Sequence, residues 1–216
     1  MRPQAPLSEQ GLALDLRPGD VLRERLIRHQ KSRRAPARQQ DHVMSAMLDH
    51  IPVLDTQRLT LRAPRKADLP TLTAFFDTER SHMVGGPVDA TGAFTKLTAR
   101  IGHWAVLGYG LWHIDSRENG DFLGWAGIIN PPGWDEPELG WTLFAHAEGK
   151  GYAFEAARAA RAYAAQAFKL DGLISYIRPD NTRSRALAEK LGATHERDGA
   201  VMGTPCQIWR HPKEAA

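Results

Sequence analysis

The chain has 216 residues, of which 42% are hydrophobic and 25% are charged, a composition typical of a globular protein that buries a core. Its net charge of +3 is too small to indicate a nucleic-acid-binding protein. Its single cysteine, Cys206, excludes an internal disulfide framework and a cysteine-rich metal site. No run of about 18 apolar residues predicts a membrane span, and the N-terminus lacks the apolar core of a secretory signal. We therefore expect a cytoplasmic protein with neither a membrane partner nor a metal ion.

The first 50 residues differ in composition from the rest of the chain. Over residues 1–40, lysine and arginine outnumber aspartate and glutamate, and prolines interrupt the segment. Apolar residues are too few there for a core, although residues 21–27 have the spacing of a short amphipathic helix. The basic run 31–40 predicts a solvated tail, with an arm that docks to an acidic partner as the alternative. We expect residues 1–50 to form a basic, flexible extension.

The folded domain is expected over residues 51–214. Leu59 and Leu61 alternate with polar residues and predict a strand. Asp68 is a candidate N-cap for the helix that follows, in which four apolar residues recur at helical spacing: Leu69, Leu72, Phe75 and Phe76. A second helix is predicted over residues 90–106, with an interruption at Gly102.

The next segments alternate between strand and helix patterns. Asn119-Gly120 separates two apolar strand patterns, residues 110–115 and 122–130, which is a strong hairpin signal. Later elements are predicted as a strand over 138–144, a helix over 152–168, a strand over 173–177, a helix over 181–191 and a last strand over 206–210. This order predicts an α+β (α/β) domain with one mixed sheet.

Two glycines, Gly149 and Gly151, stand at the start of the alanine-rich helix. Glycine there serves either a turn or an anion, because a helix N-terminus offers free backbone N–H groups. The segment lacks the G-x-x-x-x-G-K-[ST] pattern of a nucleoside-triphosphate loop. Phe154 stands where a dinucleotide fingerprint needs a small residue. The residues alone leave both readings open.

A longer stretch around these glycines is more specific. ELGWTLFAHAEGKGYAFEAARAARAYA resembles the cofactor-binding segment of the GNAT acyl-CoA N-acyltransferase superfamily, most closely its branch of ribosomal-protein alanine N-acetyltransferases. TQRLTLRAPRKADL, FLGWAGI, RPDNTRSRALAEKLGA and IWRHP resemble the same branch in the same order. The resemblance covers residues 53–213. It implies a GNAT fold over 51–214, with a central, twisted, mostly antiparallel sheet that splays at the cofactor site and is flanked by helices.

The resemblance also implies that acetyl-CoA binds as co-substrate. The implied contacts lie on the glycine loop (Glu148, Gly149, Lys150, Gly151, Tyr152 and Ala153) for the phosphates, on the preceding strand (Leu143 and Phe144) for the pantetheine arm, and on a later helix (Asn181 and Ser184). His146 replaces the family's usual arginine or glutamine before the loop. By local rules alone, Asn181 is first of all a helix cap.

The catalytic residues follow from the same resemblance. Many members carry a tyrosine acid where this chain has Ala188, and Ser184 is the nearest substitute. Glu138 is the candidate general base, with a solvated strand-end acid as the alternative reading. His113 is a second candidate base, although a strand histidine between apolar neighbours is more often packed. Glu136, two residues earlier, lies on the same side as Glu138 if the strand extends that far. Two tryptophans, Trp134 and Trp141, are candidates to wall the acceptor pocket, with core packing as the alternative.

We therefore expect an N-acetyltransferase in which a primary amine, on a protein N-terminus or a small molecule, attacks acetyl-CoA directly. The alternatives are a non-catalytic acyl-CoA-binding regulator, favoured by the missing tyrosine, and a ribosome- or RNA-associated module, supported only by the basic tail. Nucleic acid is not an expected partner, and a homodimer is left open. The sequence does not identify the acceptor, because one fold serves many substrates.

Overall fold

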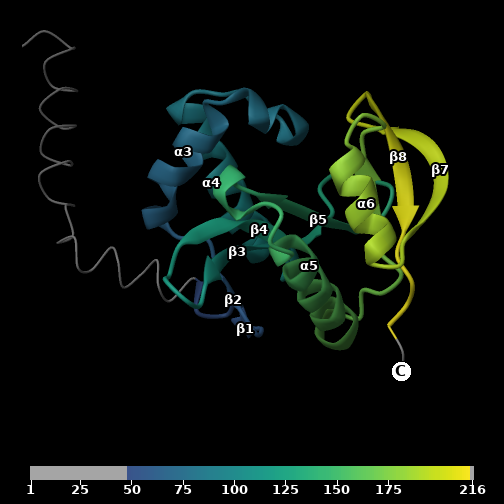
Figure 1. Ribbon diagram of the computed structural model, residues 1–216, viewed down its shortest axis with the longest axis horizontal. Helices are drawn as coiled ribbons and strands as arrows, with labels where there is room; N and C mark the ends of the chain where they lie inside the picture. The colour runs from purple at the N-terminus through teal and green to yellow at the C-terminus, as the bar shows by residue number, and fades with distance from the viewer. Residues whose placement is uncertain (1–47, 215–216) are drawn as a thin grey trace, which may run out of the picture. The chain divides into compact units, whose positions relative to one another are not determined.

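The computed structural model describes residues 48–214, and the strands among them form one eight-stranded sheet (Figure 1). The strands are β1 (Leu54–Asp55), β2 (Leu59–Arg62), β3 (Leu111–Ser116), β4 (Phe122–Ile129), β5 (Glu138–Leu143), β6 (Ile174–Ile177), β7 (Thr194–Val201) and β8 (Thr204–Arg210). Their order across the sheet is β1-β2-β3-β4-β5-β6-β8-β7. Every neighbouring pair is antiparallel except β5 and β6, which are parallel. The predicted α+β class and the mostly antiparallel sheet are confirmed.

Four α-helices are described: α3 (Leu69–Phe76), α4 (Ala90–Leu107), α5 (Tyr152–Tyr163) and α6 (Thr182–Lys190). A π-helical turn, Ala164–Phe168, extends α5 to the predicted end of that helix, and short 3-10 segments cover Lys66–Asp68, Glu79–Val84 and Ala145–Ala147. No helix within residues 48–214 has both the length and the apolarity to cross a membrane.

The helices cover opposite faces of the sheet. In β4, Ala126 and Ile128 pack in one core cluster with the alanines of α5, whereas Trp125 packs with the aromatic residues of α3. Successive strand residues point to opposite faces, so α5 lies on one face, and α3 and the first half of α4 lie on the other. Trp104, near the end of α4, packs in the cluster of α5. The buried alanines of α5 let it approach the sheet closely, since they carry the smallest side chains that still favour helix.

The sheet splays between its two parallel strands. β5 and β6 pair in register only at Glu138 and Ile174. One residue further along β5, the carbonyl oxygen of Leu139 accepts a 2.6 Å hydrogen bond from the hydroxyl of Ser175 instead of continuing the ladder. The backbone ladder between β5 and β6 therefore ends at the first residue of β5, and the Ser175 side chain makes the next contact.

One local prediction for the helices is wrong, and a second holds for the position of the residue but not for its side chain. Gly102 does not interrupt the second helix, because α4 runs unbroken from Ala90 to Leu107. Asp68 directly precedes α3, but its side chain accepts no hydrogen bond from that helix. The Asp68 carboxylate is buried and instead accepts hydrogen bonds from the Arg62 guanidinium (2.7 and 2.9 Å) and from the backbone N–H of Arg65 (2.9 Å).

The sequence pattern did not indicate β7. This strand, THERDGAV, is largely exposed and lies at the edge of the sheet. Charged residues are common on exposed edge strands, and they erase the alternation that identifies a half-buried strand. The helix predicted over residues 21–27 and the basic run 31–40 lie outside the described residues.

Candidate functional site

The glycine loop follows β5 and leads into α5. Gly149 has φ +74° and Gly151 has φ +79°, in the left-handed region that glycine enters without a steric penalty. A Cβ at Gly149 would meet no atom within 4 Å, so the backbone there faces open space. The turn reading of both glycines is confirmed, and the contact with an anion stays a prediction.

Arg58, just before β2, contacts this loop and the start of α5. Its guanidinium donates to the carbonyl oxygen of Lys150 (2.9 Å) and pairs with Glu155 of α5 (2.7 Å). It also lies 4.7 Å from the ring centre of Tyr152, within the range of a cation–π contact. Arg58 therefore ties the loop to the start of α5. Nothing in the sequence pattern around Arg58 indicated this role.

The Glu148 carboxylate lies between two arginines. Arg80 of the 3-10 segment Glu79–Val84 and Arg183 of α6 each donate a hydrogen bond to one of its oxygens. Glu148 was assigned to the cofactor through its backbone, and that contact stays a prediction. Its side chain links the loop to elements on both sides and offsets one of the two positive charges there.

β5 presents a polar face beside α3 and α4. Leu139 and Trp141 belong to or pack against the core cluster under α5, so alternation turns Glu138, Gly140 and Thr142 to the opposite face. A Cβ at Gly140 would meet no atom within 4 Å. The strand thus leaves open space next to Glu138. Trp141 lies on the other face, where it also packs near His211, so it does not line a site that contains Glu138.

Glu138 is held rather than freely solvated. One carboxylate oxygen accepts a 2.6 Å hydrogen bond from the indole N–H of Trp134, and the other accepts a 3.4 Å bond from the backbone N–H of Tyr176. Burial of the carboxyl raises the pKa of Glu138 to about 7. The solvated alternative is wrong, and the role of base stays a prediction. The neighbouring Glu136 is paired with Arg210 instead (2.6 and 2.7 Å).

His113 is packed inside the domain and is not a candidate base. Its side chain is fully buried, its ring stacks on Phe122 (centroids 4.6 Å apart), and its Nδ1–H donates to Asp68 (2.6 Å). Burial lowers the pKa of His113 to about 4. The packed reading is the correct one.

The residues assigned to the later helix lie at the start of α6. The Asn181 side chain accepts a 3.1 Å hydrogen bond from the backbone N–H of Ser184, so Asn181 is a helix cap, as local rules predict. Ala188 is fully buried. Leu143 is partly buried and Phe144 is packed among the aromatic residues of α3 and β4. Contacts of Asn181, Ser184, Leu143 and Phe144 with a cofactor stay predictions, as does that of His146, which is exposed and stacks on Phe144.

Comparison with known proteins identifies the family. Residues 58–194 match the family model of the acetyltransferase (GNAT) domain. An acetyltransferase of Agrobacterium tumefaciens str. C58 is 37% identical, with a TM-score of 0.71, and the match covers 76% of this chain and 95% of that one. The chain therefore belongs to the GNAT acetyltransferase family, as its motifs indicate.

Two further relatives extend this comparison. The uncharacterized protein YkkB of Bacillus subtilis (strain 168) is 33% identical over 106 residues, which are 47% of this chain and 62% of that protein's length. The ribosomal-protein-S5-alanine acetyltransferase of Vibrio fischeri is 15% identical over 76% of this chain and 97% of that chain, with a TM-score of 0.59. It shares the fold.

Proposed function

We propose that the protein is an N-acetyltransferase that transfers the acetyl group of acetyl-CoA to a primary amine. One observation carries this proposal: β5 bears the Glu138 carboxyl at its start, open space at Gly140, and the glycine loop beyond its end. β5 and the loop that follows it thus carry a proton acceptor, room for reacting atoms and a set of backbone N–H groups suited to phosphates.

Acetyl-CoA would supply the acyl thioester. The backbone N–H groups of residues 148–153 fit its phosphates, because Gly149 leaves that side of the loop free of side chains. The free edge of β5 next to Leu143 and Phe144 offers backbone groups for the pantetheine arm, and Asn181 and Ser184 lie at the start of α6. Holding both reactants in line would account for most of the rate.

Glu138 would take the proton of the amine. The nitrogen forms a bond to the acyl carbon, the carbon–sulfur bond breaks, and the amine proton passes to the carboxylate. With a pKa of about 7, Glu138 is a base matched to neutral pH. Ser184 or a water molecule would donate the proton that the departing thiolate takes up.

The acceptor and the setting are also proposals. The acceptor is a protein N-terminus or a small amine, in line with the ribosomal-protein acetyltransferase named above, and the reaction takes place in the cytoplasm. A non-catalytic acyl-CoA-binding regulator is the second candidate, favoured by Ala188 in place of the tyrosine acid.

Two measurements separate these candidates. Acetyl-CoA should raise the melting temperature, because a ligand that binds only the native state stabilises it by mass action, whereas NADH or ATP at equal concentration should have a much smaller effect. Thiol release from acetyl-CoA over a panel of primary amines then distinguishes an enzyme from a binder. Equal thermal shifts for all three nucleotides would refute the proposal, and binding without thiol release would favour the regulator.

A further inference from the structure

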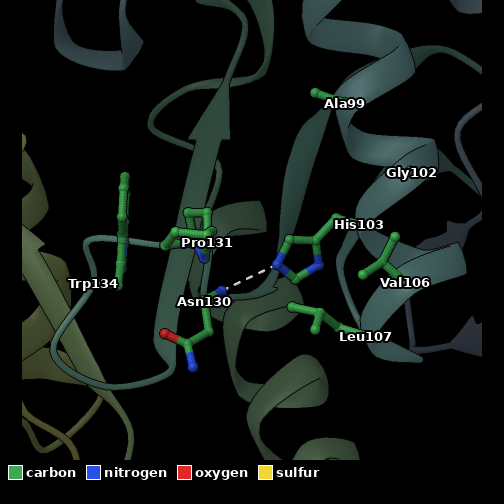
Figure 2. A pocket seen from close by; sticks show the side chains of 9 residues that line it. Ala99, Gly102, His103, Val106, Leu107, Asn130, Pro131 and Trp134 are labelled. Carbon is green, nitrogen blue, oxygen red and sulfur yellow. Dashed lines mark hydrogen bonds between the residues drawn. The ribbon is translucent and has the colours of Figure 1, made fainter.

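A hollow of about 540 Å³ lies between α4 and the segment that joins β4 to β5 (Figure 2). Its volume is within the usual range of small-molecule pockets. Its lining is mainly apolar and includes Gly102, His103, Val106, Leu107, Pro131 and Trp134. Val106 is 79% exposed and Leu107 is 40% exposed, so α4 presents apolar surface here that the described residues leave uncovered.

The one titratable residue in this lining offers no charge. The ring of His103 donates through Nδ1–H to the carbonyl oxygen of Tyr109 (2.7 Å), because a carbonyl can only accept. Its Nε2 accepts a 3.1 Å hydrogen bond from the backbone N–H of Asn130, the dashed line in Figure 2. Both ring nitrogens are occupied, and the ring is neutral in this arrangement. His103 also ties α4 to the segment after β4, which fixes the width of the hollow.

Trp134 joins the hollow to the proposed base. Its ring forms the wall opposite α4 (Figure 2), and its indole N–H donates to the Glu138 carboxylate (2.6 Å). The ring of Tyr176 packs against the same indole in a T-shaped arrangement, with ring centres 6.2 Å apart. Trp134 is therefore held in place from the side of Glu138. A molecule that presents its amine to Glu138 has this apolar surface as its neighbour.

We infer that the hollow receives an apolar side group of the acceptor. The preferred substrate is then a primary amine with an aromatic or branched aliphatic group on the carbon that bears the amino group. The inference rests on the proposed function. Apolar atoms leave water on entering the hollow. The lining holds the Asn130 amide but no charged side chain that would compensate the desolvation of a charged group. Trp134 acts as a specificity-determining wall shared by the hollow and the reaction site.

Filling the hollow tests this inference. Gly102 is helical, and a Cβ there would meet no atom within 4 Å, so Gly102→Phe places a ring in the hollow without displacing the core. Phenylalaninamide and glycinamide present the same α-amino group with and without an aromatic side group. The wild type should favour phenylalaninamide in kcat/KM on the order of tenfold or more, and Gly102→Phe should bring the ratio close to one. Thr95→Phe, at an exposed position of the same helix, should keep the wild-type ratio.

The outcomes are distinguishable. The inference would be overturned if the wild type showed a kcat/KM ratio of phenylalaninamide to glycinamide near one, or if Gly102→Phe left that ratio unchanged. In either case, acetyl transfer to glycinamide would still support the proposed function. An unchanged ratio together with dissociation of a dimer in Gly102→Phe would show that a second copy covers the hollow. If no amine releases thiol, calorimetric binding of phenylalaninamide, with and without CoA, still tests the hollow. Binding that is equal in wild type and Gly102→Phe would overturn the inference by itself.

Discussion

The hydroxyl of Ser175 in β6 donates a 2.6 Å hydrogen bond to the carbonyl oxygen of Leu139 in β5, at the point where the two parallel strands stop pairing. The same hydroxyl oxygen lies 2.9 Å from Nε2 of His211. Because the hydroxyl hydrogen is used toward Leu139, His211 must donate through Nε2–H. A buried side chain thus replaces one rung of the backbone ladder and lets β5 diverge toward the glycine loop.

Ser175→Ala should destabilise the domain. The variant leaves the Leu139 carbonyl and the His211 N–H without a partner in the interior, and an unsatisfied buried polar group costs about 1–3 kcal/mol. Urea denaturation would measure the loss. Thr98→Ala removes a hydroxyl from the exposed side of α4 and should change stability by less than about 0.5 kcal/mol. Equal stability of the two variants would show that water replaces the Ser175 contact.

His211 should make the domain sensitive to mild acid. Burial lowers its pKa from the ordinary 6.5 to about 4. Between these values the unfolded chain binds more protons than the folded one, so the free energy of unfolding falls as the pH falls from about 6.5 to about 4. His211→Gln should make this dependence shallower in urea titrations at pH 7 and pH 5. Some slope should remain, because His113, with a pKa also lowered to about 4, titrates in the same window. If the pH dependence of the free energy of unfolding were unchanged in His211→Gln, groups other than His211 would account for all of it.

Substitutions at two glycines distinguish the stability cost of backbone strain from the loss of phosphate binding. Gly149 in the loop and Gly203 in the β7–β8 turn have nearly equal φ values, +74° and +75°, and at both positions a Cβ would meet no atom within 4 Å. Gly149→Asp and Gly203→Asp should therefore cost the same stability, roughly 1–2 kcal/mol. Only Gly149→Asp should weaken acetyl-CoA binding strongly, since it sets a carboxylate against the phosphates. Equal acetyl-CoA affinities in calorimetry would mean that the glycines serve only the turn.

Glu148 should weaken the attraction of the site for an anionic ligand. Its carboxylate offsets one of the two positive charges that Arg80 and Arg183 place beside the loop. Glu148→Gln should therefore raise acetyl-CoA affinity by about threefold at low ionic strength, and salt should reduce the gain. Glu118→Gln removes the same charge from an exposed turn and serves as the control. Equal effects of the two variants at every salt concentration would refute a local role for Glu148.

The elements that were predictable from sequence are those set by local chemistry. Asn119-Gly120 fixed the hairpin of β3 and β4, and the glycine pair marked the turn before α5, because both depend on backbone conformations that few residues adopt. Asn181 caps α6 as local rules require. β7 was not predicted because its exposed, charged residues have no alternating pattern.

The contacts that build the site were not predictable in this way. Ser175 meets Leu139 across 36 residues of sequence, and Glu148 meets Arg80 across 68. Such pairings depend on the placement of whole elements, about which local patterns say nothing. Even the Trp134–Glu138 bond, four residues apart, needs the turn that brings the indole back over the start of β5.

Glu138→Gln should abolish most of the turnover while leaving the shape of the site intact. A positioned general base typically contributes about 10²–10⁴ in rate, so kcat should fall by about that much at neutral pH, while acetyl-CoA affinity barely changes. In the wild type, kcat should rise as the pH increases through about 7 and then level off, because burial raises the pKa of Glu138 to that value and only the ionised carboxylate accepts a proton. The variant should lack this inflection, and high pH should partly rescue it, since more of the amine is then already neutral. Glu136→Gln, which removes an acid two residues away that pairs with Arg210, should keep the wild-type pH profile. A loss below about threefold in Glu138→Gln, or an inflection that survives in it, would remove Glu138 from the mechanism and leave an amine that arrives deprotonated.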